Sequence, residues 1–181
     1  MRHPGLVLTG TRGAGKTTLA AIMESRHRSF SSVAAITTRP PRQDDRAGAY
    51  THLSMTEFSG LLADGSVLVH SSYGSHLYGI LSDTVSSLVR VERTPILTVT
   101  PEAAHRLIVA ALPIAWLGVF IDAPDGILDQ RLSDAGRPPS ESDIEQRVHD
   151  RSWAAAPLEH INNADDVDAA VRKVEALLTR N

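Results

Sequence analysis

The chain has 181 residues and no cysteine. This absence excludes disulfide bonds, thiolate metal sites and a cysteine nucleophile. An excess of either charge is missing too: 18 Lys and Arg stand against 21 Asp and Glu, for a net charge of −3 and a pI near 6.2. The overall charge therefore predicts no nucleic-acid partner and no anionic membrane partner.

Long hydrophobic runs are also missing. The longest apolar stretch, Leu107 to Ile121, is interrupted by Pro113 and Gly118, whereas a membrane span needs about 20 uninterrupted apolar residues. The first five residues lead directly into the short apolar run 6–8 and do not resemble a signal peptide. We therefore expect a soluble, cytoplasmic protein.

Short apolar runs alternate with amphipathic stretches along the chain, which favours an α/β fold with a five-stranded parallel sheet flanked by helices. The predicted strands are 6–9, 32–36, 96–100, 115–121 and 160–162, and the predicted helices are 16–27, 101–111, 126–134 and 165–179. Two of the predicted helix starts carry capping signals: Thr100 before Pro101, and Ser54 with Glu57 three residues on.

Two stretches interrupt this alternation. Residues 37–92 hold a polar loop, two short strand candidates and two short helices, and residues 135–143 form a polar loop between helices. We interpret the chain as one domain, 1–181, with a core of 1–36 and 93–181, an insertion of 37–92 and a lid loop of 135–143. This layout is typical of small kinases.

A phosphate-binding loop follows the first predicted strand. The run from Gly10 to Thr17 fits the pattern G-x-x-x-x-G-K-[ST] between a strand and a helix. Glycines let backbone N–H groups turn toward a phosphate, and the helix N-terminus adds partial positive charge. Lys16, one of only two lysines in the chain, falls at the position that reaches the β and γ phosphates, and the Thr17 hydroxyl is placed to bind Mg²⁺. The predicted ATP phosphate-binding residues are Gly10, Thr11, Arg12, Gly13, Ala14, Gly15, Lys16, Thr17 and Thr18.

A series of further motifs resembles the guanylate kinases, a family of P-loop kinases. These motifs are TTRPPR at 37–42, Gly48-Ala49-Tyr50, Glu57-Phe58, Leu77-Tyr78-Gly79 and DQRL at 129–132, and the likeness continues to Asn162-Asn163. The resemblance implies a core, a nucleoside-monophosphate-binding insertion and a lid, with transfer of the ATP γ-phosphoryl group to an acceptor phosphate and with ATP and Mg²⁺ as cofactors.

Matching positions assign roles to individual residues. The resemblance implies that Arg39, Arg42, Tyr50 and Tyr78 bind the acceptor phosphate, which suits forked guanidinium groups and phenolic hydroxyls. Catalytic roles are predicted for Lys16, Arg131, Arg137 and Arg147; Arg131 and Arg147 match family arginines beside the lid, and Arg137 lies two positions from the family's first lid arginine. Arg151 either joins that face or pairs with acids in solvent.

The chain departs from the family at the base-binding positions. Where guanylate kinases bind guanine with polar and acidic side chains, this sequence has Ala35, Val69, Ile80 and Thr100. An unpaired buried donor costs about 1–3 kcal/mol, so we expect an acceptor that keeps a phosphate but lacks guanine: another or modified nucleotide, or a sugar phosphate. The same departure leaves Thr17 as the predicted metal ligand, with Asp122 as a remote candidate.

Other functions stay open at this stage. A genuine guanylate kinase could bind GMP through a rearranged set of residues. The ribose 1,5-bisphosphate phosphokinases share the losses at the base-binding positions, although Arg42 and the TTRPPR run are more similar to guanylate kinases. A non-catalytic interaction domain is the third alternative, which the intact phosphate loop disfavours. The sequence gives no account of the positive charge that Arg12 adds to the loop, assigns no role to His70 or His76, and does not indicate the oligomeric state.

Overall fold

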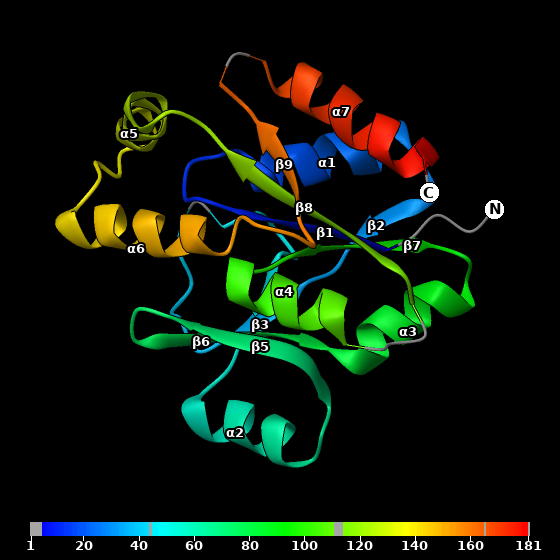
Figure 1. Cartoon of the computed structure of the whole chain (residues 1–181). Coiled ribbons are helices and arrows are strands. Elements are labelled where there is room, and N and C mark those ends of the chain that lie inside the picture. Colours follow the sequence, from blue (N-terminus) through cyan, green and yellow to red (C-terminus); the bar gives the residue numbers. More distant parts are fainter. Residues whose placement is uncertain (1–4, 44, 111–113, 165, 181) are drawn as a thin grey trace.

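The computed structural model describes residues 5–43, 45–110, 114–164 and 166–180. Within these ranges a parallel five-stranded sheet forms the core (Figure 1), with the strand order β2-β7-β1-β8-β9. Its strands are β1 (Gly5–Gly10), β2 (Phe30–Ser32), β7 (Thr94–Thr98), β8 (Trp116–Asp122) and β9 (Glu159–Asn162). The predicted α/β class and five-stranded parallel sheet are confirmed.

Helices cover both faces of this core sheet, which explains why its central strand is apolar without alternation. Every residue of β1 is buried. Leu6 and Leu8 pack with α1 (Lys16–Arg26) and α7 (Val167–Arg180), whereas Val7 points to the opposite face and packs with α4 (Pro101–Val109). α3 (Ser82–Arg90) covers the same face of the core sheet as α4 and lies beside β7.

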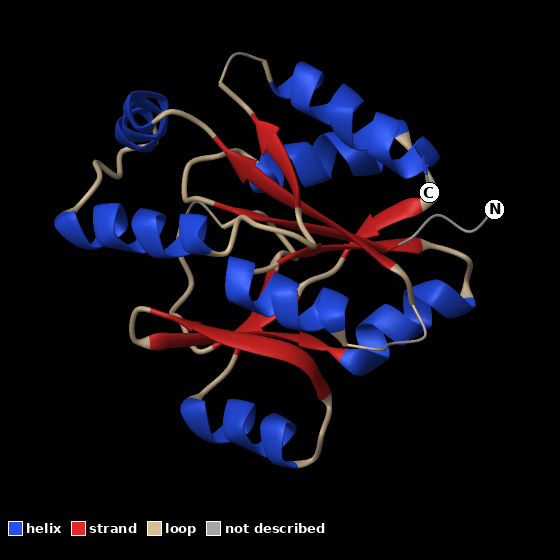
Figure 2. Cartoon of the chain, in the orientation of Figure 1, coloured by secondary structure: helices blue, strands red, loops and turns tan. Residues whose placement is uncertain are grey.

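A second sheet lies beyond α4, with the order β4-β3-β6-β5. Its strands are β3 (Ala35–Thr37), β4 (Tyr50–His52), β5 (Val67–Tyr73) and β6 (His76–Leu81). α4 contacts both β8 of the core sheet and β5 of the second sheet, and α2 (Met55–Ala63) covers the far side, where Phe58 packs close to Gly79. Figure 2 shows this layering. The insertion 37–92 therefore contributes three strands, β4, β5 and β6, rather than the two that were predicted, and these form one sheet with β3, which begins before the insertion.

The predicted strand 32–36 is wrong as a single element. Its first residue ends β2 in the core sheet, and its last two begin β3 in the second sheet, so the sequence crosses between sheets at Val33 and Ala34. The backbone N–H of Val33 still bonds to Ile96 of the core (2.9 Å), whereas that of Ala35 bonds to Ala49 of the insertion (3.0 Å). Residues 33–36 are apolar without interruption, so the hydropathy pattern does not reveal the crossing.

The predicted strand 96–100 is shifted. β7 ends at Thr98, because Thr100 leaves the sheet and caps α4, accepting a hydrogen bond from the N–H of Ala103, with Pro101 in the first turn. The predicted capping box of Ser54 and Glu57 at the start of α2 is confirmed.

The remaining helix predictions agree within a few residues. Helix 16–27 is α1, 126–134 is α5 (Asp125–Asp134), and 165–179 is α7. The predicted end of helix 101–111 and the predicted start at 165 lie outside the described residues. α6 (Glu141–Ser152) begins inside the predicted lid loop 135–143, since Ser140 and Asp143 form a capping box there. None of the helices in the described ranges has the length and apolar character needed to cross a bilayer.

Candidate active site

The phosphate loop connects β1 to α1 and depends on its glycines. Gly13 and Gly15 have φ values of 84° and 92°, a region that favours glycine. A Cβ at Gly15 would lie 2.8 Å from Nδ2 of Asn163. That amide donates a 2.8 Å hydrogen bond to the carbonyl oxygen of Ala14, so Asn163, just after β9, holds the loop in place.

The side chain of Lys16 folds back over this loop. Its Nζ donates to the carbonyl oxygens of Gly10 (2.9 Å) and Thr11 (2.8 Å). Burial lowers the pKa of Lys16 to about 8, although the nearby carboxylates of Asp150 and Asp122 act in the opposite direction. The ammonium group therefore sits over the curve of the loop, where the pattern places the β and γ phosphates.

A first cavity, of about 210 Å³, opens between the phosphate loop and the second sheet. It brings together the four positions that depart from the guanylate kinase pattern and joins them to both predicted tyrosines. Its lining includes Ala35, Val69, Ile80, Thr100, Tyr50, Tyr78, Gly10, Arg12 and Lys16, together with Tyr73, Thr98, Val99 and Asp150. These residues come from both sheets, from the two ends of the phosphate loop and from α6, so they are distant in sequence.

A second cavity, of about 460 Å³, adjoins the first. Tyr50 and Tyr78 line both. The second is rich in basic groups: Arg39, Arg42, Arg46 and Arg137 line it together with Thr17. The structure thus brings the predicted acceptor-phosphate residues near the predicted metal ligand and one predicted lid arginine.

Arg39 is the most enclosed of these arginines, with 4% of its surface exposed. Its guanidinium donates to Asp45 (2.6 Å) and to the carbonyl oxygen of Pro40 (2.8 Å), and it lies 5.1 Å from the centroid of the Tyr50 ring. Burial alone would lower the pKa of Arg39, but the hydrogen bond and the charge of Asp45, together with Tyr78, outweigh it and raise the pKa. Arg42, by contrast, is exposed, and its backbone N–H also bonds to Asp45.

The lid-side arginines have different surroundings. Arg147 is buried between two carboxylates of α5, Asp129 (2.6 Å) and Asp125 (3.2 Å), and it lines neither cavity. Arg131 donates to the carbonyl oxygen of Ala164 (3.4 Å), and its buried Nη1 has no partner among the described residues. A buried guanidinium N–H without a protein acceptor is able to donate to an anionic ligand such as a phosphate.

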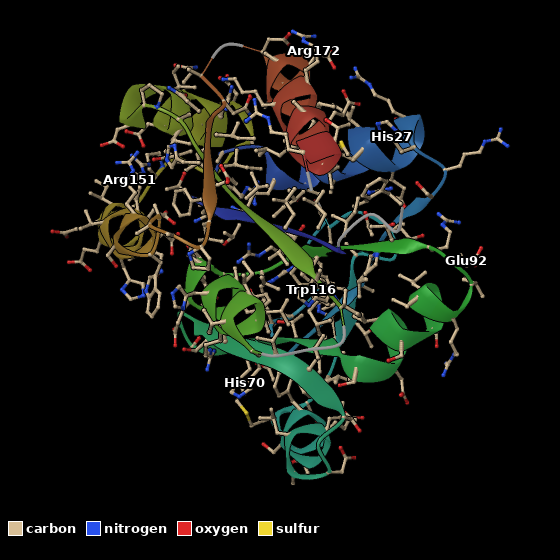
Figure 3. The ribbon with its side chains drawn as sticks, turned by 45° about the vertical axis from the view of Figure 1, so that its right-hand side comes forward. His27, His70, Glu92, Trp116, Arg151 and Arg172 are labelled. Carbon is tan, nitrogen blue, oxygen red and sulfur yellow. The ribbon has the colours of Figure 1, made fainter. Side chains whose placement is uncertain are left out.

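Arg151, near the end of α6, lies on the side of that helix that faces α5 (Figure 3). It bonds to Asp122 (2.7 Å) and Asp125 (2.7 Å). Burial would raise the pKa of Asp122, but hydrogen bonds from Arg151 and Thr11 outweigh it and hold the pKa below its usual value. Of the two alternatives given for Arg151 from the sequence, a place on the lid-side face or pairing with acids, the structure shows the pairing with acids.

A magnesium ion would find few protein ligands here. No group of three or more His, Cys, Asp or Glu side chains that could hold a metal occurs within the described ranges. The oxygens of Asp122 already accept bonds from Thr11, Arg151 and the backbone N–H of Ala123. Thr17 is exposed at the first turn of α1. One hydroxyl beside a triphosphate site fits Mg²⁺, which retains waters and binds phosphate oxygens.

Sequence reasoning missed one group at the phosphate-loop end of the first cavity. Asp150, on α6, is 4% exposed, and burial raises its pKa above the usual value. Arg12, predicted in the phosphate loop, lines the same cavity and forms an ion pair with Asp143 on α6. No local motif marks Asp150, because it enters the cavity through the packing of α6 against the loop.

The comparisons with known proteins agree with this architecture. A family model described as Guanylate kinase matches residues 2–181. A protein named Guanylate kinase from Thermosynechococcus vestitus is 31% identical over 97% of this chain and 94% of its own length. Human Protein PALS2 is 28% identical over 97% of this chain but only 34% of its own length. The crystal structure of guanylate kinase from Anaplasma phagocytophilum has the same fold, with a TM-score of 0.75 at 15% identity, covering 99% of this chain and 87% of that one.

Proposed function

Because the chain belongs to the guanylate kinase family and is an ATP-dependent phosphotransferase, we propose that it transfers the γ-phosphoryl group of ATP to the phosphate of a small acceptor other than GMP. The acceptor is a nucleoside monophosphate with a different or modified base, or a sugar phosphate. Its phosphate binds where the two cavities meet, and its remaining part enters the first cavity.

The observation that carries the proposal is the composition of the first cavity. Guanine presents N1–H and an exocyclic amine as donors, which need acceptors. Val69 and Ile80 are 8% and 1% exposed and have none, and Ala35 has none either. The Thr100 hydroxyl oxygen already accepts the N–H of Ala103. A guanine donor left unpaired at these positions would cost about 1–3 kcal/mol, and the loss of such pairing discriminates strongly against the base.

In this proposal the cationic residues carry the catalysis. An acceptor phosphate is already a nucleophile, so the main barrier is repulsion between two anions, and catalysis consists of positioning and charge neutralisation. Lys16 neutralises the β/γ bridge. Arg39, Arg42, Tyr50 and Tyr78 hold the acceptor, and Val69, Ile80 and Thr100 shape its pocket.

The lid side completes the charge neutralisation. Arg131 and Arg137 stabilise the transferring group, the first through its unpartnered Nη1 and the second from the wall of the second cavity. Arg147 joins them only by exchanging its bonds to Asp125 and Asp129. Thr17 holds Mg²⁺, which supplies further neutralisation of phosphate charge when bound.

The test is ADP release from Mg-ATP with a panel of acceptors: GMP, dGMP, AMP, CMP, UMP, dTMP and ribose 1,5-bisphosphate. We expect turnover of a member other than GMP or dGMP, with those two inert. Arg39→Ala should lower kcat/KM for that acceptor, whereas Arg90→Ala, an exposed arginine on α3, serves as the matched control. GMP as the best acceptor would refute the proposal and favour an ordinary guanylate kinase.

A further inference from the structure

Asp150 is a buried carboxylate in the first cavity that the reaction above does not use. It shares the lining with Gly10, Arg12 and Lys16 of the phosphate loop, and it is one of only two buried charged residues on α6. Its Oδ1 accepts a 2.9 Å bond from Gln146. The residue lines the cavity beside Lys16, and the charges of Asp150 and Lys16 act on each other.

The position of Asp150 along the cavity follows from the β5–β6 hairpin. Val69 pairs with Ile80 at one end, Ser71 with Tyr78 in the middle, and Tyr73 with His76 near the tip. The charges of Arg12 and Asp150 both act on the Tyr73 hydroxyl, so the tip lies at the phosphate-loop end. Strand residues advance about 3.3 Å each, which places Tyr73 about 13 Å from Val69. Asp150 therefore lies at the phosphate-loop end of the cavity, with Lys16 and Arg12, and away from Val69.

A carboxylate at this place has no catalytic role toward a phosphate acceptor, because a phosphate nucleophile needs no base. A hydroxyl nucleophile does need one, and kinases that act on hydroxyls use a carboxylate beside the γ-phosphate. Burial raises the pKa of Asp150, while Gln146, Lys16 and His149 lower it and Asp122 raises it further, and a raised pKa suits a group that must accept a proton.

We propose that Asp150 is a general base and that this site also transfers the γ-phosphoryl group to a hydroxyl of a phosphorylated acceptor. The Oδ2 atom takes the hydroxyl proton as the hydroxyl oxygen forms its bond to the γ-phosphorus. The bond between that phosphorus and the β–γ bridging oxygen breaks, and ADP leaves with the electron pair. The product is a new phosphate monoester, and the proton on Asp150 returns to water.

The acceptor chemistry is a hydroxyl group on a carbon skeleton that also bears a phosphate. The phosphate binds at Tyr50 and Tyr78, following the proposed function, and the hydroxyl reaches Asp150. Tyr78 pairs with Ser71, two residues before Tyr73, and these two strand positions are about 7 Å apart along the hairpin, which is the separation we expect between the acceptor's phosphate and its hydroxyl. A free sugar phosphate and the ribose of a nucleotide both offer this arrangement.

The experiment incubates the full chain with Mg-ATP and one of three acceptors: water alone, ribose 5-phosphate, or UMP. ³¹P NMR distinguishes a new monoester from a diphosphate, and ADP release gives the rates. We expect monoester formation with ribose 5-phosphate if the source is a free sugar phosphate, or with UMP if it is a nucleotide ribose. Asp150→Asn should reduce that rate, and acceptor-free ATP hydrolysis, by about 10²-fold or more, with an ATP dissociation constant no higher than that of the unsubstituted chain, because a negative charge beside the triphosphate is removed.

Two controls separate this role from a structural one. Glu145→Gln changes an exposed carboxylate on the same helix and should alter neither rate. Asp150→Asn should be at least as stable as the unsubstituted chain at pH 7, because a raised pKa means that burying the charged form costs stability above that pKa.

Three results would overturn the assignment of Asp150: no monoester from any acceptor, monoester formation that Asp150→Asn leaves unchanged, or a loss of rate that is matched by a loss of ATP affinity. GMP turnover to GDP would overturn the proposed acceptor class alone, because the role of Asp150 is decided by monoester products.

Discussion

Removal of the Arg39 side chain tests whether the acceptor site is held together by its own ion pair. In Arg39→Ala, the bonds to Asp45 and Pro40 and the contact with the Tyr50 ring are lost, and Asp45 keeps its charge in a site where only 17% of its side chain is exposed. Breaking a fully buried pair in this way costs about 3–5 kcal/mol.

The expected cost of Arg39→Ala is at or below the lower end of that range, because Asp45 keeps other partners. Asp45 still accepts the Arg42 backbone N–H (2.8 Å) and lies 3.6 Å from Nε2 of His52. We therefore expect a loss of about 2–3 kcal/mol in the free energy of unfolding, or a fall in Tm of about 4–12 °C for a chain of this size. The double variant Arg39→Ala/Asp45→Ala leaves no stranded charge and should recover about 1 kcal/mol or more.

Urea unfolding of the single and double variants, with acceptor and ATP kinetics on the same samples, measures both effects. Arg42→Ala is the matched comparison: its exposed side chain should change stability by less than about 0.5 kcal/mol and still raise the acceptor KM. The reasoning fails if the double variant is no more stable than Arg39→Ala, or if Arg39→Ala weakens ATP binding as much as it lowers acceptor kcat/KM.

Three further predictions concern the phosphate loop and the first cavity. The pKa of Asp122 is lowered in the fold, so the ion pair of Asp122 stabilises the protein above the ordinary pKa of an aspartate, and this stabilisation is lost as the pH falls through the lowered pKa. Arg151→Ala should therefore cost about 1 kcal/mol of unfolding free energy at pH 7. The difference in Tm between Arg151→Ala and the unsubstituted chain should shrink toward pH 3. Because the pKa of Lys16 is about 8, the ATP dissociation constant should rise between pH 7 and pH 9, and calorimetry in two buffers at pH 8.5 should show proton uptake on binding; no uptake would contradict the lowered pKa. Val69→Glu supplies an acceptor for guanine donors and should increase GMP turnover at least several-fold, while an unchanged GMP rate would mean that guanine does not enter this cavity.

The core of the fold and the phosphate loop were predictable from local patterns. Continuous apolar runs such as 6–8 occur where a parallel strand is covered on both faces. The glycines followed by Lys16, between a strand and a helix, are typical of a phosphate-binding loop, whose conformation depends on adjacent residues alone. The capping box at Ser54 and the cap at Thr100 were predictable for the same reason, since each side chain accepts a hydrogen bond from the backbone N–H three residues away.

The crossing at Val33 and Ala34 was not predictable in this way. Apolar residues at these positions fit either sheet, and the choice depends on pairing with Ile96 on one side and Ala49 on the other, which are distant in sequence. The same holds for Arg147 and Arg151, whose partners on α5 and at the end of β8 become available only when α6 packs beside them.

The sequence by itself determined the family and the types of residue in the site, because hydropathy period, glycine placement and short motifs act over a few neighbouring residues. The tertiary structure alone decided that Ala35, Val69, Ile80 and Thr100 share one cavity, that Arg39 is neutralised by Asp45, and that Asp150 faces Lys16. Burial and charge at these positions are set by segments that are far apart in the chain. Electrostatic interactions between them exist only once the two sheets and α6 have closed around the phosphate loop.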